Sequence, residues 1–340
     1  MEKNSFILVF KKLPFVFISS LFLFFLIESG LANSSTFWRF CNRYSEPMLD
    51  DGIRLEAELR TMPEVDKAKK VFLAGSSQAR EGLDIEYLNN RFENVLFYNL
   101  GASGAASGID MFMITDKLLS KQPETIVYLT FVEGFYYDYN YGKLKRYFDP
   151  KVMPYFLEHI DSRTIFSHKG HLLDAFLGRI SLFYKYRSSF GRIFSSALKD
   201  YLGMEKGDSV KRFAFRENKP RSYFMREIAK ADKKRYLATS YTVLNQQLFK
   251  LTAKEIAAKG VRLIVLSGPT HPLISDCYER EIDIAYDSFF EKQAKELGFV
   301  YLSKEQLPVF TKDDFIDFTH LNKAGRIKLT GFFGDYFSND

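Results

Sequence analysis

Five short apolar runs, separated by segments of helical character, constrain the fold of this chain more than any other feature. Short apolar strands that alternate with helices are typical of βαβ units, in which a parallel sheet is covered on both faces. We therefore expect an α/β fold, a three-layer α/β/α flavodoxin-like parallel sheet of about five strands. The predicted strands are residues 71–74, 95–99, 125–130, 261–267 and 299–302.

The connection between the third and fourth predicted strands contains a long interruption, residues 135–235. Such a length is too great for a structureless loop in a compact domain. Residues 171–187 have helical apolar spacing, so we expect a mostly helical, basic and aromatic insert that forms a cap within an α/β domain of residues 70–340. The other predicted helices are residues 53–60, 108–120, 239–259 and 284–297.

The N-terminus carries a membrane signal within residues 1–32. Lys11 and Lys12 precede an uncharged apolar run, residues 13–27, whose length lies between a signal-peptide core of about 7–15 residues and a transmembrane helix of about 20. Gly30-Leu31-Ala32 is a weak cleavage site, so a retained anchor and a removed signal peptide are both open. The lysines are expected inside and the rest outside.

We therefore expect residues 33–69 to form a juxtamembrane stalk, and the domain to lie in the periplasm or at the cell surface. It would be secreted if the N-terminal segment is removed. The membrane is thus one expected partner, through that segment.

Composition and charge exclude some classes of function. The chain has 46% hydrophobic and 26% charged residues, as an ordinary globular protein does. Its net charge is +6, and basic residues outnumber acidic ones by about two to one between Tyr136 and Tyr236. That segment is either a surface for anionic lipid or an anionic polymer, or a solvated face of mixed charge. Zinc-finger and RNA-binding signatures are missing, so no nucleic acid partner is expected.

Cysteines and histidines do not suggest a metal centre. Cys41 and Cys277 lack metal-type spacing, and they could pair in an oxidising compartment without anything requiring it. The insert contains His159, His168 and His171, with no cluster of carboxylates or cysteines beside them. We expect no metal and no cofactor.

The first candidate motif is Gly75-Ser76-Ser77-Gln78, directly after the first predicted strand. A strand ending in Gly-x-Ser can turn sharply into a helix and expose the serine hydroxyl at the edge of the sheet. Backbone N–H groups at the helix start can then hold a developing oxyanion. The same residues also suit an ordinary turn or helix cap.

The second candidate motif is Asp317-Phe318-Thr319-His320, after the last predicted strand. A nucleophilic serine needs a base, and the base needs a carboxylate that orients it and stabilises its protonated form. A separation of three residues lets Asp317 and His320 converge on Ser77 from one loop. Residues 322–325 then read as the start of a C-terminal helix.

The third candidate motif, Asn99-Leu100-Gly101-Ala102-Ser103-Gly104, follows the second predicted strand. Its glycines allow the backbone to approach a ligand closely. A plain strand-to-helix turn has the same composition.

Together these three motifs resemble the GDSL/SGNH hydrolase superfamily. Residues 75–77 resemble its first block, with Ser76 in place of the usual Asp, and residues 317–320 resemble its last block. The resemblance implies a nucleophile at Ser77, a base at His320 and an orienting carboxylate at Asp317. It also implies that the N–H groups of Ser77 and Gly104 form the oxyanion hole.

One block departs from the family pattern. The third block usually supplies an Asn after the third strand, whereas this chain reads Thr130-Phe131-Val132-Glu133-Gly134. Loss of one oxyanion donor costs about 10²–10³ in turnover in other enzymes, so another group substitutes or the activity is specialised. Arg80 and Thr270 are the candidate stand-ins. Glu133 would oppose an oxyanion unless neutralised, so a structural or substrate-binding role is expected, and His271 suits either contact with substrate or a structural role in its loop.

The resemblance implies an extracytoplasmic serine esterase or O-acyltransferase that acts on an acylated envelope polysaccharide. A second reading is a non-catalytic SGNH-like protein that assists a membrane acyltransferase or polysaccharide assembly. A third is a lipid-active esterase whose insert lies on the membrane. The site predicts the chemistry better than it predicts the acyl group or its acceptor.

Overall fold

The computed structural model describes residues 3–45, 49–63, 68–103, 107–136, 149–159, 169–204, 226, 240–275 and 280–339. The chain forms two compact units. Unit 1 contains the described residues of Met1–Thr61 and Leu173–Gly207, and unit 2 those of Met62–Leu172 and Asp208–Asp340.

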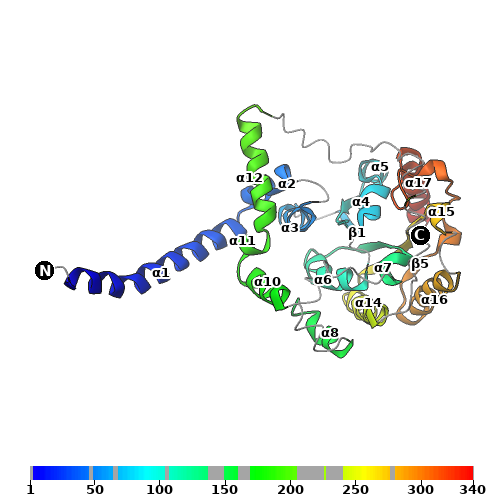
Figure 1. The fold of residues 1–340 in the computed structure, drawn as a ribbon. Helices are drawn as coiled ribbons and strands as arrows, with labels where there is room; N and C mark the ends of the chain where they lie inside the picture. Colours follow the sequence, from blue (N-terminus) through cyan, green and yellow to red (C-terminus); the bar gives the residue numbers. More distant parts are fainter. Residues whose placement is uncertain are drawn as a thin grey trace. The chain divides into compact units, whose positions relative to one another are not determined.

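A five-stranded parallel sheet forms the centre of unit 2 (Figure 1). All neighbouring strands are parallel, and the order β2-β1-β3-β4-β5 is that of flavodoxin-like sheets. The predicted α/β class is therefore confirmed. The strands are β1 (Lys69–Gly75), β2 (Val95–Asn99), β3 (Thr125–Thr130), β4 (Arg262–Ser267) and β5 (Val300–Leu302).

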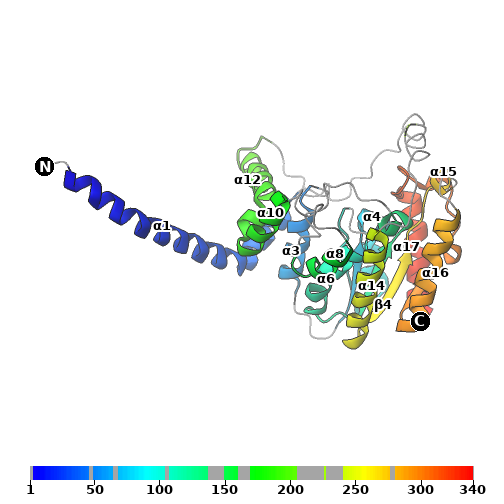
Figure 2. The same ribbon diagram turned by 60° about the horizontal axis from the view of Figure 1, so that its bottom comes forward.

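Helices cover both faces of this sheet because strand side chains alternate between the two faces. Leu73 and Leu129 pack on one face, while Tyr128 stacks on Phe249 at the other, with ring centroids 6.2 Å apart. The first face is covered by α4 (Ser77–Gly82), α5 (Ile85–Arg91) and α17 (Lys323–Asn339), and the second by α6 (Gly108–Leu119), α14 (Ser240–Ala258) and α16 (Arg280–Leu297). Figure 2 shows α14 lying along β4.

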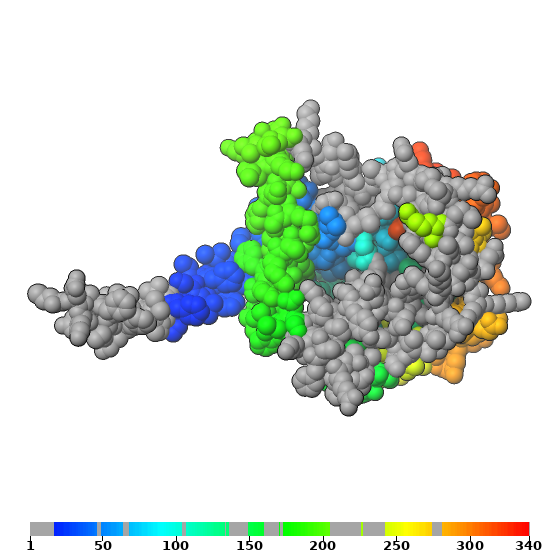
Figure 3. Space-filling model, in the orientation of Figure 1, coloured from blue at the N-terminus to red at the C-terminus, as the bar shows by residue number. Residues whose placement is uncertain are grey.

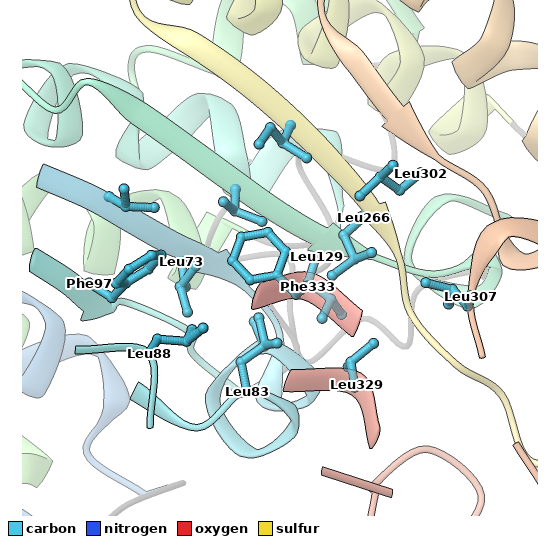
Figure 4. Packing of buried hydrophobic residues seen from close by; sticks show 14 of the residues in the cluster. Leu73, Leu83, Leu88, Phe97, Leu129, Leu266, Leu302, Leu307, Leu329 and Phe333 are labelled. Atoms are coloured by element: carbon cyan, nitrogen blue, oxygen red, sulfur yellow. The ribbon is translucent and has the colours of Figure 1, made fainter. Parts of the chain in front are cut away.

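The core beneath α4, α5 and α17 holds the first candidate motif in place (Figure 4). Each buried Leu or Phe contributes roughly 1.5–3 kcal/mol relative to an exposed one, so this cluster fixes α4 against the sheet. Its labelled members are Leu73, Leu83, Leu88, Phe97, Leu129, Leu266, Leu302, Leu307, Leu329 and Phe333.

The predicted insert is divided between the two units. Its beginning, with α7 (Val132–Tyr136) and α8 (Met153–His159), belongs to unit 2, whereas Leu173–Gly207 belongs to unit 1. His159 lies 2.6 Å from the side-chain oxygen of Gln247 on α14, measured from Nε2. The short elements of unit 2 are completed by α15 (Pro272–Ser275), η3 (Lys304–Gln306) and η4 (Lys312–Asp314).

Unit 1 consists of helices from two segments of the chain that are far apart in the sequence. The stretch predicted as a stalk contains α2 (Ser35–Tyr44) and α3 (Asp51–Thr61), which pack with later helices around a buried core. The other helices are α1 (Lys3–Ala32), α10 (Lys169–Ile180), α11 (Leu182–Lys185) and α12 (Arg187–Tyr201). Core members are Phe37, Trp38, Cys41, Ile53, Ala57, Tyr186, Phe190 and Ile193.

The segment 171–187, for which helical structure is predicted, is helical but not continuous. Ser181 ends the continuous segment because its hydroxyl accepts a hydrogen bond from the N–H of Tyr184 at 3.1 Å and caps α11. Tyr186 is buried and separates α11 from α12. The segment is therefore divided among α10, α11 and the start of α12.

The N-terminal segment gives a mixed result for a membrane span. Among the residues with described placement, no single helix is long and apolar enough to cross a membrane. Phe17–Ala32 and Ser35–Tyr44 meet the length and composition criteria only as a pair bent by 77°. Cys41 is a buried free thiol whose pKa is raised by burial to about 12, and Cys277 lies outside the described residues.

Candidate active site

The turn between β1 and α4 places Ser77 at the carboxyl edge of the sheet. Gly75 has a φ of +132°, and a Cβ there would lie 2.2 Å from the carbonyl oxygen of Leu129. Only glycine fits such a turn. The hydroxyl of Ser76 accepts a hydrogen bond from the N–H of Gln78 at 3.1 Å and so caps α4. Ser76 is therefore engaged with the backbone, and Ser77 is the serine that faces the second motif.

The structure brings Ser77, His320 and Asp317 into one hydrogen-bonded chain. The Oγ atom of Ser77 lies 2.8 Å from Nε2 of His320. Nδ1 of the same ring lies 2.8 and 2.9 Å from the two carboxylate oxygens of Asp317. An imidazole that donates from Nδ1 to a carboxylate accepts at Nε2, so this arrangement suits removal of the proton from Ser77.

The loop that carries Asp317 and His320 is held closed by its own backbone. Ile316 donates its N–H to the carbonyl of His320 at 2.8 Å, and Asn322 donates to the carbonyl of Asp314 at 2.9 Å. Lys328 of α17 forms an ion pair with Asp314 at 2.7 Å. The side chain of Asn322 accepts hydrogen bonds from Ala324 and Gly325 and caps α17. The loop is thereby fixed to the helix predicted after it.

Asp317 is held in its ionised form. It is only 8% exposed, and burial by itself opposes ionisation. Hydrogen bonds and charge from the His320 ring, with backbone N–H bonds from Thr319 and His320 at 3.0 and 2.9 Å, outweigh that effect. The pKa of Asp317 is lowered to about 2. Its carboxylate can therefore orient His320 and stabilise an imidazolium at neutral pH.

The third candidate motif is tied to the helix that carries Ser77. The side chain of Asn99 donates to the carbonyl of Arg80 at 2.8 Å and accepts from the N–H of Gly101 at 3.1 Å. A Cβ on Gly101 would lie 2.6 Å from the backbone nitrogen of Arg80, so glycine permits this close approach. Gly104 lies outside the described residues, and its role as an oxyanion donor stays a prediction.

Arg80 lies inside the protein and not at the surface of the site. It is 1% exposed, and its guanidinium donates to the hydroxyl of Ser103 at 3.1 Å and to the carboxylate of Glu81 at 2.7 Å. These contacts link α4 to the third candidate motif. Arg80 therefore supports the shape of that loop.

The remaining candidates lie mostly after β4. His271 is 1% exposed, and its ring meets those of Phe315 and Phe318 edge-on, at centroid distances of 5.2 and 5.5 Å. Burial lowers the pKa of His271, although the charge of Asp317 opposes the shift. His271 thus packs against the loop of Asp317 as a neutral ring. The Thr270 hydroxyl has no hydrogen-bond partner in the described part of the chain.

The side chain of Glu133 is not among those described, so its proposed contact with substrate stays a prediction. Within the described residues, no three His, Cys, Asp or Glu side chains form a group that could hold a metal ion.

Two supporting residues were not identified from the sequence. Thr319 donates its backbone N–H to Asp317, in the turn that an Asp forms with the residue two positions later. The signal was available, because Asp, Asn, Ser and Thr commonly form such turns. Gln78 donates its side-chain amide to the carbonyl of Pro269 at 3.3 Å, and no sequence pattern indicates that contact.

The comparisons with family models and with curated proteins found no relative of this chain. No family model matches the chain. No curated protein matches it with significant similarity.

Replacement of Gly75 by Ala should destabilise the protein by about 2–5 kcal/mol, because the methyl group would meet the Leu129 carbonyl in addition to the unfavourable φ. Urea unfolding in detergent would measure the change. Gly260→Ala is the matched control, since Gly260 also has a positive φ, +68°, but open space around it; a cost of roughly 1–2 kcal/mol is expected there. Equal effects of the two substitutions would contradict the role given to the close approach.

The ionisation of Asp317 should contribute to stability in a defined pH range. Its folded pKa of about 2 lies below the ordinary value of 3.8, so the contribution is fully present above pH 4 and is lost as the pH falls through about 2. The lowered pKa of Asp317 corresponds to a contribution of about 2 kcal/mol to the free energy of unfolding. Unfolding measurements from pH 5 to pH 2 should show wild type and Asp317→Asn converging at the acid end. A stability gap that stays constant over this range would contradict the assignment.

Proposed function

We propose that this protein is an extracytoplasmic serine esterase or O-acyltransferase acting on acyl groups of a cell-envelope glycan. The observation that carries the proposal is the hydrogen-bonded chain from Asp317 through His320 to Ser77, with contacts of 2.8 Å on both sides of the imidazole. Nucleophile, base and orienting carboxylate are the three parts that acyl transfer through a serine requires.

In the first half of the reaction, Oγ of Ser77 attacks the acyl carbonyl carbon while Nε2 of His320 takes the hydroxyl proton. The tetrahedral oxyanion is held by backbone N–H groups, for which Ser77 and Gly104 are the proposed donors. The bond to the leaving alcohol then breaks, and His320 returns the proton to that oxygen. The product of this half is an acyl ester on Ser77.

In the second half, His320 removes a proton from the acceptor, and the acceptor oxygen attacks the acyl ester. Water as acceptor gives hydrolysis, and a sugar hydroxyl gives O-acyl transfer. Ser77 regains its proton from His320 when the acyl–serine bond breaks. Ionised Asp317 stabilises the imidazolium in both halves.

The proposed location and substrate rest on different support from the chemistry. α1 exposes large apolar side chains around its surface, which suits insertion in lipid. They include Phe17, Ile18, Leu21, Phe22, Leu23, Leu26 and Ile27. The glycan substrate rests on the resemblance to membrane-tethered SGNH proteins of the envelope.

A second candidate function is favoured by the segment after β3. It contains no asparagine between Thr130 and Gly134, and α7 begins at Val132, directly after the strand. A site that lacks one oxyanion donor suits a non-catalytic SGNH-like envelope protein that assists a membrane acyltransferase or polysaccharide assembly.

A fluorophosphonate probe separates the two functions. The full chain in detergent is expected to be labelled at Ser77, located by mass spectrometry, and labelling should disappear in Ser77→Ala. His320→Ala should slow labelling by about 10²–10⁴, because the base is lost. Ser76→Ala is the matched control: it removes a neighbouring hydroxyl that caps α4 and should leave labelling at Ser77.

Folded wild-type protein that is neither labelled nor able to hydrolyse p-nitrophenyl acetate would overturn the enzyme proposal and favour the second candidate. Circular dichroism of each variant would establish that the fold is retained.

A further inference from the structure

Two helices of unit 1 carry a row of exposed apolar side chains. On α10, Leu173, Phe176 and Ile180 are spaced by three and four residues and are at least half exposed. On α12 and its C-terminal cap residue Leu202, the side chains of Phe194, Leu198 and Leu202 repeat every four residues, and Tyr201 is also exposed. Such spacing places side chains on one face of a helix. These seven residues are called the outer stripe below.

Most of the outer stripe on α12 lies away from the face that packs in the core of unit 1. Phe194, at the edge of the stripe, is half exposed, and its ring also contacts Phe40 and Phe190. Phe190 and Ile193 are buried in that core. Ser195, Ser196 and Lys199 are exposed on the opposite side of the helix. α12 therefore has a buried face, an exposed apolar face and a polar face, which is the pattern of a helix that lies at a membrane surface.

The N-terminal helix is built into the same unit. Glu28 of α1 is 5% exposed, and its carboxylate accepts hydrogen bonds from the Ser181 hydroxyl at 2.9 Å and the Phe183 N–H at 2.7 Å. The carbonyl of Ala32, the last residue of α1, accepts from the indole of Trp38 at 2.7 Å. Cleavage at Gly30-Leu31-Ala32 would remove Glu28 from its partners, so the folded unit requires a retained α1.

The directions of the helices agree with a membrane surface. α2 leaves the end of α1 at a bend of 77°. α12 runs alongside α2, as three contacts in the same order along both helices show: Phe37 with Phe190, Phe40 with Phe194, and Tyr44 with Asp200. In Figures 1 and 2 the axis of α1 runs across that of α12. Figure 3 shows α10, α11 and α12 as one continuous column in green. With α1 in a bilayer, α12 lies along its surface.

The net positive charge of α2, α10, α11 and α12 favours an anionic lipid surface over a neutral one. Residues 35–44 and 173–204 contain seven arginine and lysine side chains and two aspartates. Arg187 and Arg192 form ion pairs with Asp174 and Asp50, so five of the seven basic side chains lie outside these two pairs. Arg39 and Arg43 are both exposed on α2. Basic side chains near a membrane surface are attracted by anionic headgroups.

We propose that unit 1 docks flat on an anionic lipid bilayer: α1 is retained in the membrane, and the outer stripe of α10 and α12 lies in the headgroup layer. The occupant of the stripe is lipid, because α1, which packs against α11 through Phe24 and Phe183, exposes large apolar side chains in the same unit. This proposal is independent of the chemistry at Ser77, and it holds or fails whether or not the serine reacts.

Fluorophore positioning tests the proposal on the full chain. Leu198→Cys on the stripe and Ser196→Cys on the polar face, each with Cys277→Ser, would be labelled with an environment-sensitive dye; Cys41 is buried and stays unlabelled. Both labelled positions are exposed, so neither substitution disturbs the core. The proteins would be reconstituted into vesicles of phosphatidylcholine and phosphatidylglycerol.

Spin-labelled lipid should quench the dye at position 198 several-fold more than at position 196, and aqueous iodide should show the reverse order. Vesicles of phosphatidylcholine alone should protect position 198 less. The intact mass of the purified protein should correspond to a chain that still contains residues 1–32. Equal quenching at the two positions would overturn the docking of the stripe on the membrane. Equal protection of position 198 in both kinds of vesicle would overturn the preference for an anionic surface. A mature chain that begins at Asn33 would overturn the retention of α1.

Discussion

The contact between Ser77 and His320 depends on one constraint, the parallel arrangement of the strands. In a parallel sheet all carboxyl ends share one edge, so loops that follow different strands meet there. Ser77 follows β1, Asn99 ends β2, and the loop of His320 follows β5, so residues 243 positions apart come within 2.8 Å. An antiparallel neighbour would have put one of these loops at the opposite edge.

The glycines at this edge show how closely the strands and loops are packed. Gly75 lies against the backbone of β3, and Gly268 donates its N–H to the Thr130 carbonyl at 2.6 Å, where a Cβ would meet the Gln78 side chain. At both glycines the missing side chain lets two backbone segments approach closely. Among the described residues, the side chains of the hydrogen-bonded chain to Ser77 are those of His320 and ionised Asp317.

Much of the sheet and the core of the site could be predicted from the sequence, for physical reasons. Strands buried on both faces are continuous apolar runs, and β3 begins and ends at the predicted residues 125 and 130. The pair Asp317 and His320 was visible because both side chains come from one loop. Arg80 was predicted beside substrate, but its guanidinium is buried and donates to Ser103, which lies 23 residues later, a contact that the sequence does not indicate.

Unit 1 could not be predicted, because periodicity shows that a helix has an apolar face without showing what covers it. Residues 33–69 were expected as a stalk and residues 171–187 as part of a helical insert, yet helices of both segments pack around one core. The break at Ser181 involves Glu28, which lies 153 residues earlier in the chain. A contact of that separation leaves no local pattern.

The separation between Glu28 and Ser181 also sets an order of events during synthesis. At roughly 5–20 residues per second, Ser181 is made about 8–30 seconds after Glu28, which lies 153 residues earlier in the chain. During that interval the carboxylate of Glu28 lacks the two donors that it has in the folded unit, the Ser181 hydroxyl and the Phe183 N–H. Unit 1 is consequently assembled from the first and the middle parts of the chain, and it closes only after β1, β2 and β3 have been synthesised.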